Sequence, residues 1–318
     1  MEAANHPDSR CVIVVDADRA RASEVAGASG AKSEADWHAV VEQADVDVVI
    51  AATPNGLLCE IATAALTAGK HVLIEKPMGR NLAEAEQMRA SAIRAGKLLK
   101  VGFNHRYHPA IVEMKRRFDD GQVGLAINVR CRYGHGGRPG YEREWRGNRE
   151  LAGGGELTDQ GVHVIDLFQW FLHLPTNAFA WLQTAIWPLG DLEDNGFGMF
   201  RYQSGVVASF HTSWTQWKNL FSLELFGTEG ALVVEGLGRS YGTETLTTYR
   251  RNPAGGAPAT DVMRYEGDDT SWRDEWAEMV NAISLGTPMN GTADDGVAAM
   301  RMLDALYRSA AAGQPVGL

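Results

Sequence analysis

The stretch VDVVIAATPNGLLCEIATAALTAGKHVLIEKP, residues 46–77, decides the fold. Its first part, 46–52, is almost wholly apolar, which predicts a strand covered on both faces. Residues 57–68 predict a helix that Gly69 ends, and 71–74 predict the next strand. A strand, a helix and a strand joined by short links are typical of a parallel sheet with helices on its faces.

The same alternation extends on both sides of this stretch. Further strands are predicted at 11–15 and 98–103, and further helices at 19–27, 35–44 and 82–95. Residues 1–104 are therefore predicted to form a Rossmann-type parallel-sheet domain.

The pattern changes after residue 104, and eight of the nine tryptophans lie beyond residue 144. Residues 105–318 are predicted to form an α+β domain with one large, mostly antiparallel, open sheet, in which 202–206 and 227–230 are hairpin turns and 252–261 a surface loop. The strands are expected at 125–133, 179–187, 197–202, 206–217, 221–226 and 231–235, and the helices at 109–120, 158–172, 271–284 and 292–311.

Composition excludes several classes of function. The chain has 318 residues and a formal net charge of −10, which makes nucleic acid an improbable partner. Its three cysteines are odd in number and far apart, so we expect neither disulfides nor a zinc site. No apolar run approaches the roughly 18 residues that a membrane span requires. These features predict a cytoplasmic protein that needs no membrane.

Polar residues follow each predicted parallel strand: Asp16, Thr53-Pro54-Asn55, Glu75-Lys76 and Asn104. Any one of these clusters is as well explained by an ordinary turn. Ligands bind outside the carboxyl ends of parallel strands, so the four together favour a cofactor site for a dinucleotide. An acid such as Asp16 binds the ribose hydroxyls and repels a 2′-phosphate, which predicts NAD, although Arg19 or Arg21 would help to accommodate NADP.

The glycine-rich phosphate loop of a dinucleotide fold comes about 20 residues before such an acid. Counting back from Asp16 passes Met1. We therefore expect the first strand and its loop to be missing from this domain, encoded upstream of residue 1, and we expect the chain as written to bind NAD weakly.

Lys76 is the candidate catalytic base. Oxidising a secondary alcohol requires a base for the hydroxyl proton while the nicotinamide takes the hydride. The segment GGGELTDQGVHVID, 153–166, supplies partners, because Asp159 and His163 share a helix face and Asp166 is in range to hold the His163 imidazole. An N-cap aspartate with a core histidine, or a metal site, are the alternative interpretations.

Substrate contacts are predicted from the loop before the glycines, which combines aromatic side chains with arginines. Arg146 and Tyr133 are the members we select, since guanidinium groups and phenols suit polyhydroxylated or anionic substrates. The tryptophan-rich strands, with Trp181, Trp187, Trp214 and Trp217, indicate packing or a subunit interface.

These motifs together resemble the Gfo/Idh/MocA family of glucose–fructose oxidoreductases and inositol dehydrogenases. The resemblance covers Ala52-Thr53-Pro54-Asn55, Glu75-Lys76-Pro77, Gly102-Phe103-Asn104 with Arg106, and Gly153-Gly154-Gly155 with Asp159 and His163. It implies NAD or NADP as cofactor, a catalytic Lys76 with Asp159 and His163, a cis Lys76–Pro77 bond, and dimers or tetramers formed through the open sheet. It also makes Lys76, Asp159, His163 and Arg106 candidates for contact with the substrate. Cys59 departs from the histidine of many relatives.

Three functions are compatible with this sequence. The first is an NAD(P)-dependent dehydrogenase or reductase acting on a sugar, a cyclitol or a nucleotide sugar. The second uses NAD transiently to cleave a glycosidic bond, and the third is a non-catalytic regulatory binding protein. The joint presence of Lys76, Asp159 and His163 favours catalysis.

Overall fold

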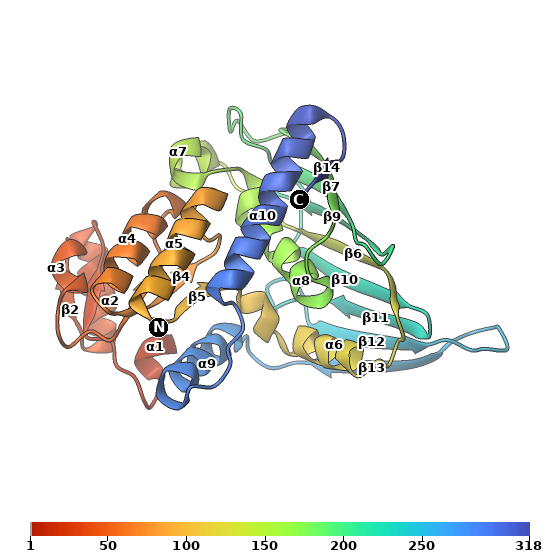
Figure 1. The fold of residues 1–318 in the computed structure, drawn as a ribbon, viewed down its shortest axis with the longest axis horizontal. Helices are drawn as coiled ribbons and strands as arrows, with labels where there is room; N and C mark the ends of the chain where they lie inside the picture. Colours follow the sequence, from red (N-terminus) through yellow and green to blue (C-terminus); the bar gives the residue numbers. More distant parts are fainter. Residues whose placement is uncertain (1) are drawn as a thin grey trace.

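The computed structural model describes residues 2–318 and places the parallel strands in two small sheets (Figure 1). β1 (Ile13–Val15) pairs with β2 (Lys32–Glu34), and β3 (Val48–Ala51), β4 (His71–Glu75) and β5 (Leu99–Gly102) form the other sheet. No backbone pairing joins β1 to β3 in the described part of the chain. The helices of this half are α1 (Glu2–Asn5), α2 (Arg19–Ser29), α3 (His38–Val41), α4 (Asn55–Thr67) and α5 (Leu82–Ala95).

The central strand β4 is buried on both faces, as its apolar run predicts. Val72 and Ile74 belong to the main core with residues of α4 and α5. Leu73 points to the other face, where Trp276 and Met279 of α9 (Ser271–Leu285) cover it. Helix α9, which comes late in the chain, thus covers one face of the sheet formed by β3, β4 and β5. β4 and α9 share a hydrophobic cluster although they lie on opposite sides of residue 104.

The second half is built on a nine-stranded sheet in the order β13-β12-β11-β10-β6-β9-β8-β7-β14, in which only the β6–β9 pair is parallel. Its helices α6 (Pro109–Asp119), α8 (Val162–Leu172) and α10 (Ala293–Ala312) lie along one face, and the other face stays open (Figure 1). This confirms the predicted fold class. The strands are β6 (Ala126–Gly134), β7 (Asn177–Gln183), β8 (Asn195–Arg201), β9 (Val207–Ser213), β10 (Leu220–Gly227), β11 (Gly230–Glu235), β12 (Glu244–Arg250), β13 (Ala259–Tyr265) and β14 (Val316–Gly317).

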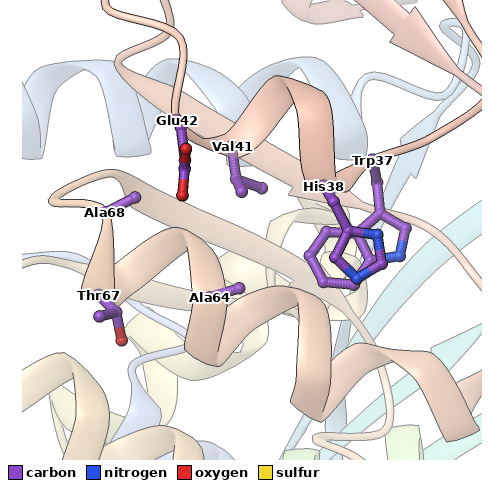
Figure 2. A pocket seen from close by; sticks show the side chains of 7 residues that line it. All are labelled: Trp37, His38, Val41, Glu42, Ala64, Thr67 and Ala68. Atoms are coloured by element: carbon purple, nitrogen blue, oxygen red, sulfur yellow. The ribbon is translucent and has the colours of Figure 1, made fainter.

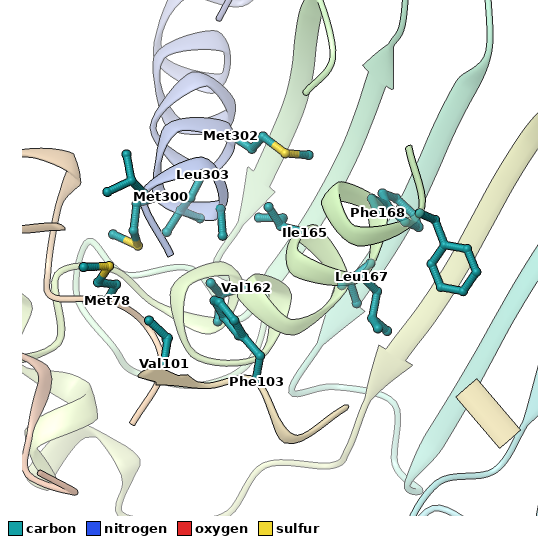
Figure 3. Packing of buried hydrophobic residues seen from close by; sticks show 14 of the residues in the cluster. Met78, Val101, Phe103, Val162, Ile165, Leu167, Phe168, Met300, Met302 and Leu303 are labelled. Atoms are coloured by element: carbon teal, nitrogen blue, oxygen red, sulfur yellow. The ribbon is translucent and has the colours of Figure 1, made fainter. Parts of the chain in front are cut away.

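One hydrophobic core joins the two halves. Met78, Val101 and Phe103 of the first half meet α8 and α10, as Figure 3 shows. Glycine permits the close approach of α10, because a Cβ on Gly296 would lie 2.4 Å from the Met78 sulfur. Helix α8 therefore packs against residues of the parallel-strand half and against the large sheet. These contacts fix the position of the side chains in its first turn.

Four strands of the described residues were not predicted from the sequence. β2, with the residues Lys32-Ser33-Glu34, is exposed throughout and carries no apolar signal. β13 is an edge strand of the large sheet and β12 is its neighbour, and in both Thr and charged residues alternate with few large apolar ones. β14, at the other edge, has only two residues. The predicted loop 252–261 is wrong at its end, because residues 259–261 pair with β12.

Candidate active site

Lys76 and Asp159 meet as a half-buried ion pair between the two halves. The Lys76 Nζ donates to the Asp159 Oδ1 at 3.0 Å and to its backbone oxygen at 2.5 Å. Arg146 donates from Nε to the other carboxylate oxygen, Oδ2, at 3.2 Å. Burial alone would raise the pKa of Asp159, but the two cations outweigh it and lower that pKa, so the carboxyl stays ionised.

Local structure positions both partners. Lys76 follows β4 directly, and its bond to Pro77 is cis, as the family resemblance implies. Asp159 lies in a π-helical turn, Leu157–Gly161, that precedes α8. The preceding glycines are needed for close approach, since a Cβ on Gly155 would stand 2.2 Å from the Glu193 backbone oxygen. The Glu193 carboxylate also accepts from the Gly155 and Leu157 amides, at 3.0 and 3.1 Å.

His163 starts α8 beside this pair and is buried. Burial lowers the pKa of His163 well below its usual value, and Lys76 and His108 add to the effect, so the imidazole is neutral. The expected bond from Asp166 is wrong: the Asp166 carboxylate binds Arg106, and the His163 Nδ1 has no partner in residues 2–318. Arginine offers that carboxylate two parallel hydrogen bonds, which a histidine nitrogen cannot match.

Arg106, predicted to contact the substrate, is instead an interior residue. Its guanidinium donates to Asp166 at 2.6 and 2.8 Å and to Gln169 at 3.0 Å, and it lies 3.3 Å from Asp295 of α10. Burial works against this charge, but the carboxylates of Asp166 and Asp295 outweigh it and raise the pKa of Arg106. The Nε and Nη2 groups of Arg106 thus connect it to α8 and α10, and with 1% of its side chain exposed it offers no surface to a substrate.

Two predicted cofactor residues are likewise engaged inside the protein. The Asn55 amide donates to the Ala152 backbone oxygen at 2.8 Å, and the Asn104 amide donates to the Ser271 hydroxyl at 3.0 Å. Both therefore join the first half to the second. Thr53 and Pro54, half-buried at the beginning of α4, remain at the carboxyl end of β3.

An aromatic and imidazole cluster lies behind His163. The His105 ring lies 3.8 Å from the His163 ring between centroids, at an interplanar angle of 44°, and the Tyr133 hydroxyl lies 3.5 Å from the His105 Nε2. Tyr133, predicted to bind substrate, is only 5% exposed, and its ring centroid lies 5.1 Å from that of Tyr241. The sequence placed His105 at a strand end next to Asn104 but gave it no role, and it gave no role to Tyr241.

Unpaired polar atoms occur in this region. Of the eight buried side-chain atoms without a hydrogen-bond partner among the described residues, four belong to it: His105 Nδ1, Glu156 Oε1, Gln160 Oε1 and His163 Nδ1. The other four are on Thr63, Tyr202, Trp214 and Glu275. Burial raises the pKa of Glu156 well above its usual value, with Glu193 and Asp159 adding to the effect, so this acid is neutral. Buried polar groups in proteins are nearly always paired, so the unpaired atoms of this region fit a site for a ligand rich in hydroxyl groups.

The strand ends carry a group that fits one part of NAD. Asp16, about one-third exposed, follows β1, and its Oδ2 lies 3.7 Å from an Arg21 nitrogen. Its position suits ribose hydroxyls. Asp18 instead caps α2, accepting from the Ala20 amide at 2.9 Å. Glu75 directly precedes Lys76 at the end of β4, and burial raises the pKa of its carboxyl.

A cavity of about 570 Å³ lies elsewhere, between α3 and α4 (Figure 2). Trp37 and His38 stack at one end of it, and none of the residues discussed above lines it. Within residues 2–318 no three His, Cys, Asp or Glu side chains are arranged to hold a metal ion, and no helix has the length and apolar character to cross a bilayer.

Solved structures with the same architecture include a levoglucosan dehydrogenase in complex with NADH and levoglucosan. Its TM-score is 0.89 at 26% identity, and the alignment covers 98% of this chain and 91% of that one. The levoglucosan dehydrogenase of Pseudarthrobacter phenanthrenivorans is 29% identical over 70% of this chain and 64% of its own. The 1,5-anhydro-D-fructose reductase of Ensifer adhaerens is 32% identical over 89% of this chain and 83% of its own.

Family models match both halves. Residues 2–103 match the oxidoreductase family with an NAD-binding Rossmann fold, and residues 111–233 match the GFO/IDH/MocA C-terminal domain. The relatives span nearly the whole chain in the same order of elements. The chain therefore belongs to the Gfo/Idh/MocA family of NAD-binding oxidoreductases.

Proposed function

We propose that the protein oxidises a secondary alcohol of a sugar or cyclitol, or reduces the corresponding ketone, with NAD as the partner. The observation that carries this proposal is the half-buried Lys76–Asp159–Arg146 group next to neutral His163 and the unpaired polar atoms. NAD, when bound, supplies the hydride acceptor or donor. The family and its named sugar dehydrogenases support the same reaction class.

In this proposal Lys76 moves the proton. In the reduction direction the Lys76 ammonium gives one proton to the carbonyl oxygen while the carbonyl carbon receives the hydride, and the lysine is left as the neutral amine. Oxidation is the reverse: the neutral amine takes the hydroxyl proton while the carbon gives up the hydride, so one two-electron oxidation is balanced by one proton. Asp159 holds Nζ in place, and Arg146 holds Asp159 from the opposite side. Neutral His163 has a free Nδ1 that is suited to bind the reacting oxygen.

A substrate panel tests the reaction. We would measure NADH formation with levoglucosan, myo-inositol and D-xylose, and NADH consumption with 1,5-anhydro-D-fructose. Stoichiometric change in NADH with any of them supports a net redox reaction. Cleavage of a glycoside without net NADH change would support the redox-assisted glycosidase, and no reaction with any of them, together with binding of a sugar, would support the regulatory protein.

Asp16 is expected to make the protein prefer NAD to NADP. Its carboxylate would face a 2′-phosphate, and a preference of about tenfold or more is plausible for two nearby charges at a partly exposed site. Calorimetry gives the dissociation constants of NAD and NADP, and their ratio measures the preference. Asp16→Ser should reduce the preference for NAD. Glu24→Gln on α2, which also removes an exposed carboxylate, is the charge control. Equal or tighter binding of NADP by the unchanged protein would contradict the assignment.

We also propose a homo-oligomer formed through the open face of the large sheet. Trp181, Phe197 and His211 form one row across β7, β8 and β9, and Trp181 is 64% exposed. Contiguous apolar surface of this kind marks protein interfaces. We expect Trp181→Lys to lower the mass measured by sedimentation relative to the unchanged protein. Trp272→Lys, an equally bulky exposed tryptophan on α9, is the control and should not. A monomeric unchanged protein would refute the proposal.

A further inference from the structure

A short hairpin between β11 and β12, residues 236–242, lies beside the aromatic and imidazole cluster that adjoins His163. Its backbone turns through four residues with positive φ: Gly236, Gly238, Arg239 and Gly242. Leu237 is buried in the main core and anchors the start of the hairpin, while Tyr241 is half-buried at its far side. Since nothing in the reaction proposed above uses this hairpin, its rigid construction requires an explanation.

The hairpin is fixed to the imidazole cluster by one carboxylate. Glu244 accepts from the Gly238 amide at 2.8 Å and pairs with the His108 Nδ1 at 2.7 Å. The His108 ring in turn lies 5.6 Å from the His105 ring, and the His105 ring lies 3.8 Å from the His163 ring, both centroid to centroid. The space around Gly238 is full, because a Cβ there would lie 2.5 Å from an Asp269 oxygen and 3.0 Å from the His108 ring. The position of Tyr241 is thereby linked to that of His163.

Tyr241 is half-buried and lies against this cluster. Its ring lies 5.1 Å from that of Tyr133, which is buried, and the Tyr133 ring lies in turn 6.3 Å from that of His163. Tyr241 is therefore one side chain removed from His163. Gln160, whose Oε1 is buried without a partner among the described residues, belongs to the turn just before His163. Burial raises the pKa of Tyr241, and the Tyr133 and Gln160 side chains work against that effect.

We propose that Tyr241 is a specificity-determining residue, whose hydroxyl binds a non-reacting hydroxyl of the substrate beside Gln160. This inference rests on the proposed sugar oxidoreductase function. A phenol hydroxyl can both donate and accept a hydrogen bond. Tyr241 can therefore bind a sugar hydroxyl that donates its own proton to the Gln160 Oε1. A site built to bond a particular hydroxyl discriminates strongly against analogues that lack it, since the buried polar groups are then left unpaired.

The test compares Tyr241→Phe with the unchanged protein on whichever substrate of the panel is oxidised or reduced fastest, and on its monodeoxy analogues. We expect KM for the sugar to rise about 3- to 10-fold, with kcat and the KM for NAD within about twofold, because one neutral hydrogen bond made equally in the ground and transition states is lost. One monodeoxy analogue should bind more weakly than the parent sugar to the unchanged protein but equally to Tyr241→Phe.

Tyr249→Phe is the matched control. This tyrosine lies on the same β11–β12 ribbon, paired with Ala231 and away from the hairpin, and its removal should change neither constant. If Tyr241→Phe leaves the sugar KM and the discrimination among deoxy analogues unchanged, the assignment is overturned while the proposed function stands. If the unchanged protein transforms no member of the panel, the proposed function fails and the inference fails with it.

Discussion

Lys76→Ala should lower kcat by about 100-fold or more, because general acid–base catalysis by a positioned side chain contributes about 10²–10⁴-fold to a rate. The fold should survive, since the lysine side chain is not part of a hydrophobic cluster and lies at the edge of the site. Steady-state kinetics on the active panel substrate measures the loss, and calorimetry with NAD checks that the cofactor still binds. A mutant that keeps near-normal turnover would remove Lys76 from the mechanism.

The partners of Lys76 sharpen this test. Removing Lys76 leaves Arg146 as the one cation that binds Asp159 in the described residues. It also removes the positive charge of Lys76, which helps to lower the pKa of His163. If Lys76 and His163 act on the same proton, the double mutant Lys76→Ala/His163→Ala should be little worse than Lys76→Ala. A combined loss equal to the product of the two single losses would mean that the residues act independently.

Arg106→Ala should lower the free energy of unfolding by about 3–5 kcal/mol, the cost of removing one partner from a buried ion pair. Arg106 and Asp166 are each 1% exposed at the side chain, so the remaining carboxylate would be left without a counter-charge. Urea unfolding followed by circular dichroism measures the change. The free energy of unfolding falls because the remaining carboxylate is desolvated without a counter-charge, and this destabilises the folded state by more than the intact pair stabilises it.

The control for this prediction is Arg116→Ala on α6. Arg116 makes the same kind of bond, to Glu113 and Asp120, but it is exposed, and surface ion pairs add little to stability. Arg106→Ala/Asp166→Asn should lose less than the sum of the two single changes, because the second substitution removes the unpaired charge. A loss for Arg106→Ala no larger than for Arg116→Ala would show that water or a rearranged side chain replaces the guanidinium.

Hydrophobic periodicity and turn residues in the sequence predict most of the fold. Helix α5 was expected at 82–95 and is found there, since Asn81 caps its beginning and Gly96 ends it in a left-handed conformation. The helix predicted at 158–172 is present but begins with a π-helical turn, which no local pattern indicates. The strands β2, β12 and β13 were missed because strand formation there depends on a neighbouring strand rather than on apolar residues.

For the site, the sequence by itself determined which groups lie near the strand ends and the glycine triplet, because chain direction in a parallel sheet brings carboxyl ends to one edge. Lys76, Asp159 and Arg146 could be selected in that way. Only the tertiary structure decided which partner each charge takes. Asp166 pairs with Arg106 rather than with His163, because the guanidinium donates one hydrogen bond to each carboxylate oxygen. The pair is buried, where an ionised carboxylate without a counter-charge would be strongly destabilising. Tyr241 reaches the site from a hairpin distant in sequence, and its approach depends on packing that no short-range pattern encodes.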